Sequence, residues 1–169
     1  EEFLYQGKLY GLDFRKGPVH KIYLDEETYQ LVYQVKESKA WPKKKEIRDR
    51  LVAFYKRQGV RVLNQVVKDN ADIMELYPTK LSFRSQKTRW GSCSSNGHIS
   101  LNWRLILAPK ESLEYVVIHE LAHLQHQNHS KHFWSLVERH MPDYEQWKNW
   151  LNEHGFEFDF LAKKSELYD

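Results

Sequence analysis

The sequence predicts an α+β fold in which an antiparallel or mixed sheet packs on an apolar helix. Apolar clusters separated by turn residues predict strands over residues 3–36, apolar and polar residues alternate over 80–86 as in a half-buried strand, and a further strand is predicted at 98–103. Helical periodicity of apolar residues covers residues 42–68 and the stretch after Pro109. A chain of 169 residues, of which 41% are hydrophobic, is long enough for one domain with a substantial core.

Composition excludes several classes of protein. No apolar run approaches the ~20 residues of a membrane helix, so we predict no membrane partner. A net charge of +3 is too small to indicate nucleic-acid binding by itself. The single cysteine, Cys93, rules out an internal disulfide and fits a reducing compartment, so we predict a cytoplasmic protein.

Residues 1–36 are predicted to form an antiparallel β-meander that is one layer of the same domain as residues 37–169. The first strand region ends in a turn at Lys16-Gly17-Pro18, and a second turn falls at Asp25-Glu26-Glu27. A further strand follows between Tyr29 and Val35. We interpret this layer as a scaffold and not as a ligand site.

A long helix is predicted over residues 42–68, because Pro42 suits a first helical turn and apolar residues recur at helical spacing. Its inner stripe consists of Ile47, Leu51, Phe54, Val62 and Val66, and Gly59 is a weak point. Its outer face is basic and consists of Lys43, Lys44, Lys45, Arg48, Arg50, Lys56, Arg57 and Arg61. We interpret this face as solvated; the alternative is contact with phosphate or an acidic partner.

Short elements follow this helix. Residues 69–78 are predicted to form a loop or a short helix, and residues 80–86 the next strand. Asn96-Gly97 is a strong signal for a tight turn, and it precedes a strand at His98–Trp103. Pro109 then opens an apolar helix.

Two more helices are predicted near the C-terminus. Ser130 is suited to cap a helix that runs from Lys131 to His140, and Pro142 begins another helix that stops at Gly155. We interpret the aromatic residues of these helices as core. Residues 156–169 are expected to form a loose tail.

The run His119-Glu120-Leu121-Ala122-His123 indicates a catalytic metal site. Residues four apart lie one turn above each other on one face of a helix, so His119 and His123 can hold one ion. A catalytic zinc takes three protein ligands and leaves the fourth position for water. Glu120 follows the first histidine, where its carboxylate can reach that water as general base.

The third ligand is less directly determined. His126 shares the helical face, but a straight helix puts it ~10.5 Å from His119 along the axis, too far for bonds of roughly 2 Å to one ion. The chain must therefore turn, and Asn128 tolerates the left-handed conformation that ends a helix. His129 then matches a known 1-5-11 spacing of zinc ligands, and His132 is its rival.

Several motifs together resemble the YgjP-like metallopeptidase family. They are Thr88-Arg89-Trp90-Gly91-Ser92-Cys93, Ile99-Ser100-Leu101-Asn102, Leu107-Ala108-Pro109, Tyr115-Val116-Val117, His119-Glu120-Leu121-Ala122-His123, Asn128-His129-Ser130, Phe133-Trp134 and Pro142-Asp143-Tyr144. The resemblance covers almost the whole chain, and the family is similar to the SprT and WLM zinc peptidases. Members usually carry another strand and helix before the region of Tyr5, so we expect residues upstream of Glu1.

The resemblance implies a zincin-like minimal metallopeptidase domain. It implies His119, His123 and His129 as the metal ligands, because the family motif includes Asn-His-Ser, and Glu120 as the catalytic glutamate. The expected cofactor is one Zn²⁺ per chain, although nickel or cobalt also suit such a site. The expected substrate is a peptide or protein, paired with His98–Trp103 as an edge strand.

Three residues near the site have roles that the sequence leaves open. Arg89 and Asn102 either hold the substrate or oxyanion or are structural. Cys93 is interpreted as a small buried filler, and the alternative is a position near the metal, where its thiol could inhibit the site. No general base accompanies it in the sequence, so we do not propose a cysteine nucleophile.

Two other functions are compatible with the sequence. Some members of this family are associated with nucleoside triphosphate (UTP-type) pyrophosphohydrolase activity, for which Arg84, Lys87, Arg89 and Arg104 would supply cations, although no Gly-rich phosphate loop is present. The other is a DNA- or protein-binding module that uses the basic helix 42–68.

Overall fold

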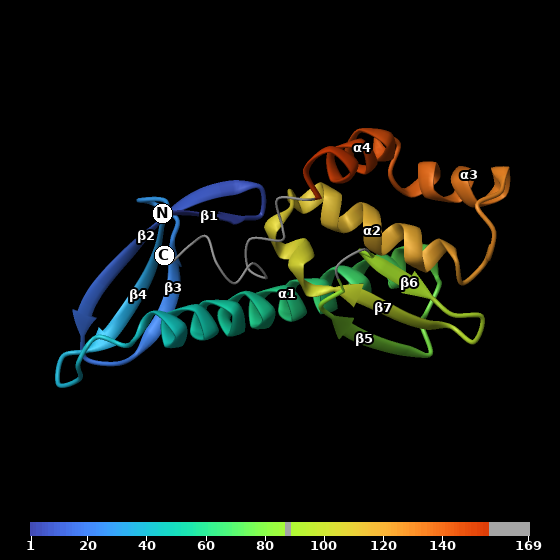
Figure 1. Cartoon of the computed structure of the whole chain (residues 1–169). Helices are drawn as coiled ribbons and strands as arrows, with labels where there is room; N and C mark the ends of the chain where they lie inside the picture. Colours follow the sequence, from blue (N-terminus) through green and yellow to red (C-terminus); the bar gives the residue numbers. More distant parts are fainter. Residues whose placement is uncertain (87–88, 156–169) are drawn as a thin grey trace.

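A single long helix, α1 (Lys44–Met74), connects two sheets that lie toward its opposite ends (Figure 1). The computed structural model describes residues 1–86 and 89–155 of the chain. The predicted loose tail at 156–169 and the predicted cation Lys87 lie outside these residues. The mixture of helices and mixed sheets confirms the predicted α+β class.

The N-terminal sheet is mixed, so the predicted antiparallel meander is wrong. Its strands β1 (Glu2–Tyr5), β2 (Lys8–Gly17), β3 (Lys21–Asp25) and β4 (Gln30–Lys36) have the order β1-β2-β4-β3. β4 pairs parallel with β2 and antiparallel with β3. Its residues 31–35 are all buried, and such a continuous buried run belongs in the middle of a sheet, where both faces are covered.

The hairpin between β1 and β2 attaches this sheet to the rest of the molecule. Gln6 and Gly7 form its tip with positive φ angles of 47° and 75°. Their backbone N–H groups donate to the carbonyls of Ile106 and Leu107 at 2.8 and 2.9 Å. One hydrophobic core runs from Phe3 to Leu151. The division at residues 36 and 37 stays a prediction.

α1 is longer than predicted, and residues 69–74 belong to it. Asn70, Ala71 and Met74 continue its buried stripe, and Glu75 ends it in the left-handed conformation with φ 55°. The prediction placed Val62 and Val66 in this stripe, but both are only half-buried. Leu63 and Val67 are buried in their place.

The second sheet has β7 at its centre. Its strands β5 (Lys80–Arg84), β6 (Gly91–Cys93) and β7 (His98–Asn102) have the order β5-β7-β6, with β5 parallel and β6 antiparallel to β7. The prediction of an edge strand at 98–103 is therefore wrong, and β6 occupies that edge. A buried 3₁₀ helix, η1 (Trp103–Leu107), follows β7.

The three remaining helices confirm the predicted pattern. α2 (Lys110–Ala122) has Pro109 at its N-cap position. α3 (Lys131–His140) is capped by Ser130, whose Oγ accepts from the N–H of Phe133 at 3.4 Å, and α4 (Tyr144–His154) ends at Gly155. α2 lies between the second sheet and the pair α3–α4 (Figure 1). Among the helices described, none combines the length and apolar character needed to cross a membrane.

Gly59 is a packing requirement and not the predicted weak point of α1. It is buried where α1 crosses η1, and a Cβ built on it would lie 2.4 Å from the carbonyl oxygen of Trp103. This is closer than any normal contact. Because the obstacle is backbone, a side chain at this position forces α1 and η1 apart.

We predict that Gly59→Ala lowers the free energy of unfolding by about 1–3 kcal/mol, the usual cost of overpacking, although alanine favours helix by ~1 kcal/mol. Urea denaturation measures the change. Gly11→Ala is the matched control, because a Cβ built on Gly11 would have no other atom within 4 Å. Equal or greater stability of Gly59→Ala would contradict the close approach.

Candidate metal centre

The two histidines of the H-E-x-x-H run lie at the C-terminal end of α2. The helix ends at Ala122, and His123 is its C-cap residue. Its last turn then tightens, since the N–H groups of Leu124 and Gln125 donate three residues back, to the carbonyls of Leu121 and Ala122. This tightening lets the chain fold back. The predicted left-handed Asn128 is wrong, because its φ is not positive.

Three imidazole nitrogens converge at this point. The Nε2 atom of His129 lies 3.1 Å from Nε2 of His123 and 3.2 Å from Nε2 of His119. A tetrahedral zinc with Zn–N bonds of ~2.05 Å requires nitrogens about 3.3 Å apart. The spacing therefore fits three ligands of one ion.

Hydrogen bonds on the far side of two rings select the tautomer that ligation needs. The Nδ1 atom of His123 lies 3.0 Å from the carbonyl oxygen of His126. A carbonyl only accepts, so Nδ1 carries the proton and Nε2 keeps its lone pair. Nδ1 of His119 lies 3.2 Å from the hydroxyl of Tyr115, which can accept in the same way. Such outer contacts orient metal-binding histidines.

Aromatic residues of α3 hold the three rings in place. Phe133 is fully buried and contacts all of them, stacking on His123 with 4.5 Å between ring centroids and meeting His119 and His129 edge-on at 4.9 Å. Trp134 stacks on His129 at 5.8 Å. Sequence reasoning interpreted these residues only as core, yet their position directly after the Ser130 cap was a usable signal.

His126 and His132 lie outside the nitrogen cluster. Their rings stack on each other with centroids 6.0 Å apart. Within the described residues, the metal-compatible group consists of His119, His123 and His129. The rival ligand His132 is thus not brought to the site, and His126 contributes only its backbone carbonyl.

Burial controls the charge state of the site. It lowers the pKa of His119 to about 3, assisted by the charges of His123, His129 and Lys148. Burial also raises the pKa of Glu120, which is 6% exposed, to about 7. His119 is therefore neutral and available to a cation, and Glu120 is tuned near the pH at which a general base works best.

Glu120 lies directly against β6. A Cβ built on Gly91 would lie 2.9 Å from Cγ of Glu120, so only glycine leaves room for the carboxylate at this point. The edge of β6 is open in the same place. The carbonyl of Trp90 and the N–H of Ser94 bond to β7, so by alternation the main-chain groups of Gly91 and Cys93 point away from it.

The site lies in a cleft of about 380 Å³ between β6, α2 and α4. Its lining consists of Arg89, Trp90, Gly91, Ser92, Cys93, Tyr115, Val116, His119, Glu120, His123, His129, Lys148, Leu151 and Asn152. Lys148 carries no motif and occurs in a polar stretch of α4, so no sequence signal identified it. Tyr115 could have been found, because it lies four residues before His119.

The two predicted substrate contacts have different outcomes. Arg89 lines the cleft. Asn102 does not: it is 3% exposed, and its Nδ2 donates to the carbonyls of Gln86 and Arg89 at 2.7 and 3.2 Å, which favours the structural one of the two roles left open by the sequence. Its Oδ1 accepts from the N–H of Arg104. Asn102 therefore holds the segment that carries Arg89.

Of the cations proposed for phosphate that the structure describes, only Arg89 lines the cleft of the metal centre. Arg89 lines the cleft, but Arg84 extends from the end of β5 and Arg104 is buried beside Trp103. The basic face of α1 lies elsewhere as well. Arg50 and Arg57 line a separate cavity of about 220 Å³ with His20 and Lys21. Contact with nucleic acid or a protein at this face stays a prediction.

One protein family and two solved structures are similar to this chain. A family model described as YgjP-like, metallopeptidase domain, matches residues 1–154. The crystal structure of the metallopeptidase zymogen of Pyrococcus abyssi abylysin is similar at 26% identity and a TM-score of 0.48, covering 54% of this chain and 93% of that chain. The zymogen of Methanocaldococcus jannaschii jannalysin is similar at 16% identity and a TM-score of 0.48, covering 54% and 94%. No curated protein matches the sequence significantly.

We predict that His119→Ala, His123→Ala and His129→Ala each lose the bound metal, because each removes one of the converging nitrogens. Metal content by mass spectrometry after purification with added zinc is the measurement. His126→Ala and His132→Ala are the controls and should retain one ion, since neither ring points into the cluster. Loss of metal in His132→Ala but not in His129→Ala would contradict this ligand set.

We predict that Cys93 reacts slowly with iodoacetamide at pH 8 in the metal-free protein. Burial and the nearby charge of Glu120 raise the pKa of its thiol. The pH midpoint of alkylation should therefore lie above the ~8.5 of an unperturbed cysteine, because less thiolate is present at each lower pH. Glu120→Gln should lower the midpoint by removing one cause. A midpoint below 8.5 in the wild type would indicate an activated thiol and contradict the burial.

Proposed function

Because the chain belongs to the YgjP-like metallopeptidase family, we propose that it is a zinc-dependent peptidase whose metal is held by His119, His123 and His129. The observation that carries the proposal is the convergence of three Nε2 atoms beside the buried Glu120, with those of His119 and His123 lying within 3.2 Å of that of His129. Three imidazoles leave one position open for water, which is the arrangement of catalytic zinc. Zinc bound there would lower the pKa of water toward ~7 and polarise the scissile carbonyl.

Glu120 is the proposed general base. It takes a proton from the attacking water and passes it to the leaving amine nitrogen. Two observations support this role. Its pKa of about 7 lets it both accept and release a proton near neutral pH. It is also the single carboxylate in the lining of the cleft as described.

β6 is the proposed binding strand for the substrate backbone. An extended peptide beside it would accept and donate hydrogen bonds at the outward-facing main-chain groups of Gly91 and Cys93. A peptide at this outer edge would lie in the cleft, next to the carboxylate of Glu120. β6 takes the role that sequence reasoning assigned to residues 98–103.

The same geometry supports peptide cleavage over nucleotide cleavage. A triphosphate needs several cations close to the metal, whereas neither Arg84 nor Arg104 lines the cleft. A peptide needs an open strand edge, which β6 provides. A cytoplasmic location stays a prediction based on the single cysteine.

We predict that Glu120→Gln reduces cleavage of fluorescently labelled casein by about 10²–10⁴-fold, the usual contribution of a general base, and retains bound zinc. Casein hydrolysis and metal content are measured on the same samples. Glu111→Gln is the matched control, because Glu111 is an exposed glutamate in the first turn of the same helix. Undiminished cleavage in Glu120→Gln would contradict the role of Glu120. Hydrolysis of UTP instead of casein by the wild type would favour the nucleotide function.

A further inference from the structure

We propose that the cleft selects peptides that carry a carboxylate beside the scissile bond, and that Lys148 on α4 binds this carboxylate. The inference rests on the proposed peptidase function and adds to it a substrate class and a specificity residue. Lys148 lies in one wall of the cleft, and no residue of this wall belongs to the metal-binding motif of the family.

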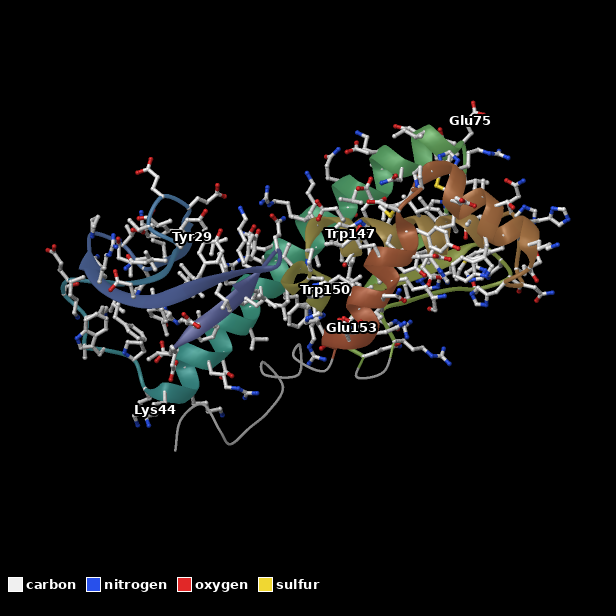
Figure 2. All side chains as sticks on the ribbon, turned by 90° about the horizontal axis from the view of Figure 1, so that it is seen from above. Tyr29, Lys44, Glu75, Trp147, Trp150 and Glu153 are labelled. Atoms are coloured by element: carbon white, nitrogen blue, oxygen red, sulfur yellow. The ribbon has the colours of Figure 1, made fainter. Side chains whose placement is uncertain are left out.

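The wall is formed by one flank of α4. Lys148, Leu151 and Asn152 line the cleft, and their spacing of three and four residues puts them on the same helical face. Figure 2 labels Trp147, Trp150 and Glu153 on this helix. The buried Leu151 and the contact of Ser112 Oγ with the carbonyl of Trp147, at 3.4 Å, fix α4 on α2. Lys148 is therefore held toward the cleft by the packing of its helix.

The ammonium group of Lys148 is positioned beside the metal ligands. Its Nζ lies 4.4 Å from the centroid of the Trp134 ring, and Trp134 stacks on His129. Lys148 forms no ion pair with any carboxylate of the described residues. A half-buried cation without a counter-charge attracts an anionic group of a ligand.

The charges of the whole cleft favour the same ligand. Lys148 and Arg89 are its permanent cations, and Glu120 is the single acid among the lining residues described. A divalent metal adds further positive charge. A substrate carboxylate therefore gains Coulomb attraction, while a lysine or arginine side chain in the same place is repelled. A pocket without charged residues would not discriminate between substrates of different charge.

Two sources supply such a carboxylate. One is the side chain of an aspartate or glutamate near the cleaved bond, and the other is the C-terminus of a short peptide. Both present the same planar oxygen pair to an ammonium group. The cleft of about 380 Å³ has room for either.

The test compares wild type with Lys148→Met, which keeps most of the length of the side chain but removes its charge, and with Lys148→Glu. A peptide library is digested, and cleavage sites are identified by mass spectrometry. Half of the library is amidated at its C-termini, which separates internal carboxylates from terminal ones. Lys110→Met is the control, because Lys110 is exposed and lies outside the lining of the cleft. Zinc content is measured for every variant.

In the wild type, we expect bonds beside a carboxylate to be cleaved about 10-fold faster than matched bonds beside an amide, as for a charge-assisted hydrogen bond. The preference should vanish in Lys148→Met, reverse toward lysine and arginine in Lys148→Glu, and persist in Lys110→Met. Loss of cleavage at terminal sites on amidation would identify the C-terminus as the source; retention would identify the side chain. An unchanged preference in zinc-loaded Lys148→Met would overturn the inference.

A binding measurement separates this inference from the peptidase function. Fluorescein-labelled peptides that differ only by glutamate or glutamine are titrated into zinc-loaded Glu120→Gln protein, with and without Lys148→Met. Tighter binding of the glutamate peptide that depends on Lys148 supports the inference even where no peptide is cleaved by the wild type. Equal affinities for the two peptides would overturn it while leaving the peptidase function intact.

Discussion

The convergence of three imidazole lone pairs is the constraint on which the second half of this structure depends. Nitrogens 3.1 and 3.2 Å apart repel each other unless a cation or proton lies between them. Burial disfavours the proton at His119, so a metal ion is the better partner. The rings do not reach this arrangement by themselves. The tightened end of α2 turns the chain, Ser130 starts α3 in the right place, and Phe133 packs against all three rings.

Close packing around Glu120 and His119 also determines their protonation states. Glu120 is buried between α2 and β6 because residue 91 has no side chain. Burial raises the pKa of Glu120 to about 7 and lowers that of His119, so one environment brings the carboxyl group close to neutral pH in its titration and keeps the imidazole neutral. On the other side of α2, α4 contributes a cation instead of an acid. The cleft therefore combines one carboxylate with the cations Arg89 and Lys148, and the proposed preference for anionic peptides rests on this arrangement of charge.

The buried helix η1 connects this site to the N-terminal sheet. Gln6 and Gly7 bond to its carbonyls from one side, and Gly59 of α1 packs on Trp103 from another. β7 leads directly into η1, and η1 leads into α2 through Pro109. The positions of β7 and of α2, which carries His119, are thus determined by contacts with both ends of the molecule. This gives the N-terminal sheet a structural role in the site, although none of its residues lines the cleft.

The sequence by itself determined the features that depend on local spacing. The pitch of a helix brings His119 and His123 together wherever the chain folds, and Ser130 and Gly155 limit their helices through local hydrogen bonds and conformation. The choice of His129 over His132 came from the family motif, and the structure brings His129 to the other two rings.

Tertiary structure alone decided what depends on distant partners. Strand order depends on non-local pairing, so β6 and not β7 is the free edge, and β4 lies between β2 and β3. Asn102 became structural because the segment before β6 packs over it, and Lys148 reached the cleft because α4 packs on α2. No local sequence pattern predicts either contact, because each joins segments that only the folded chain brings together.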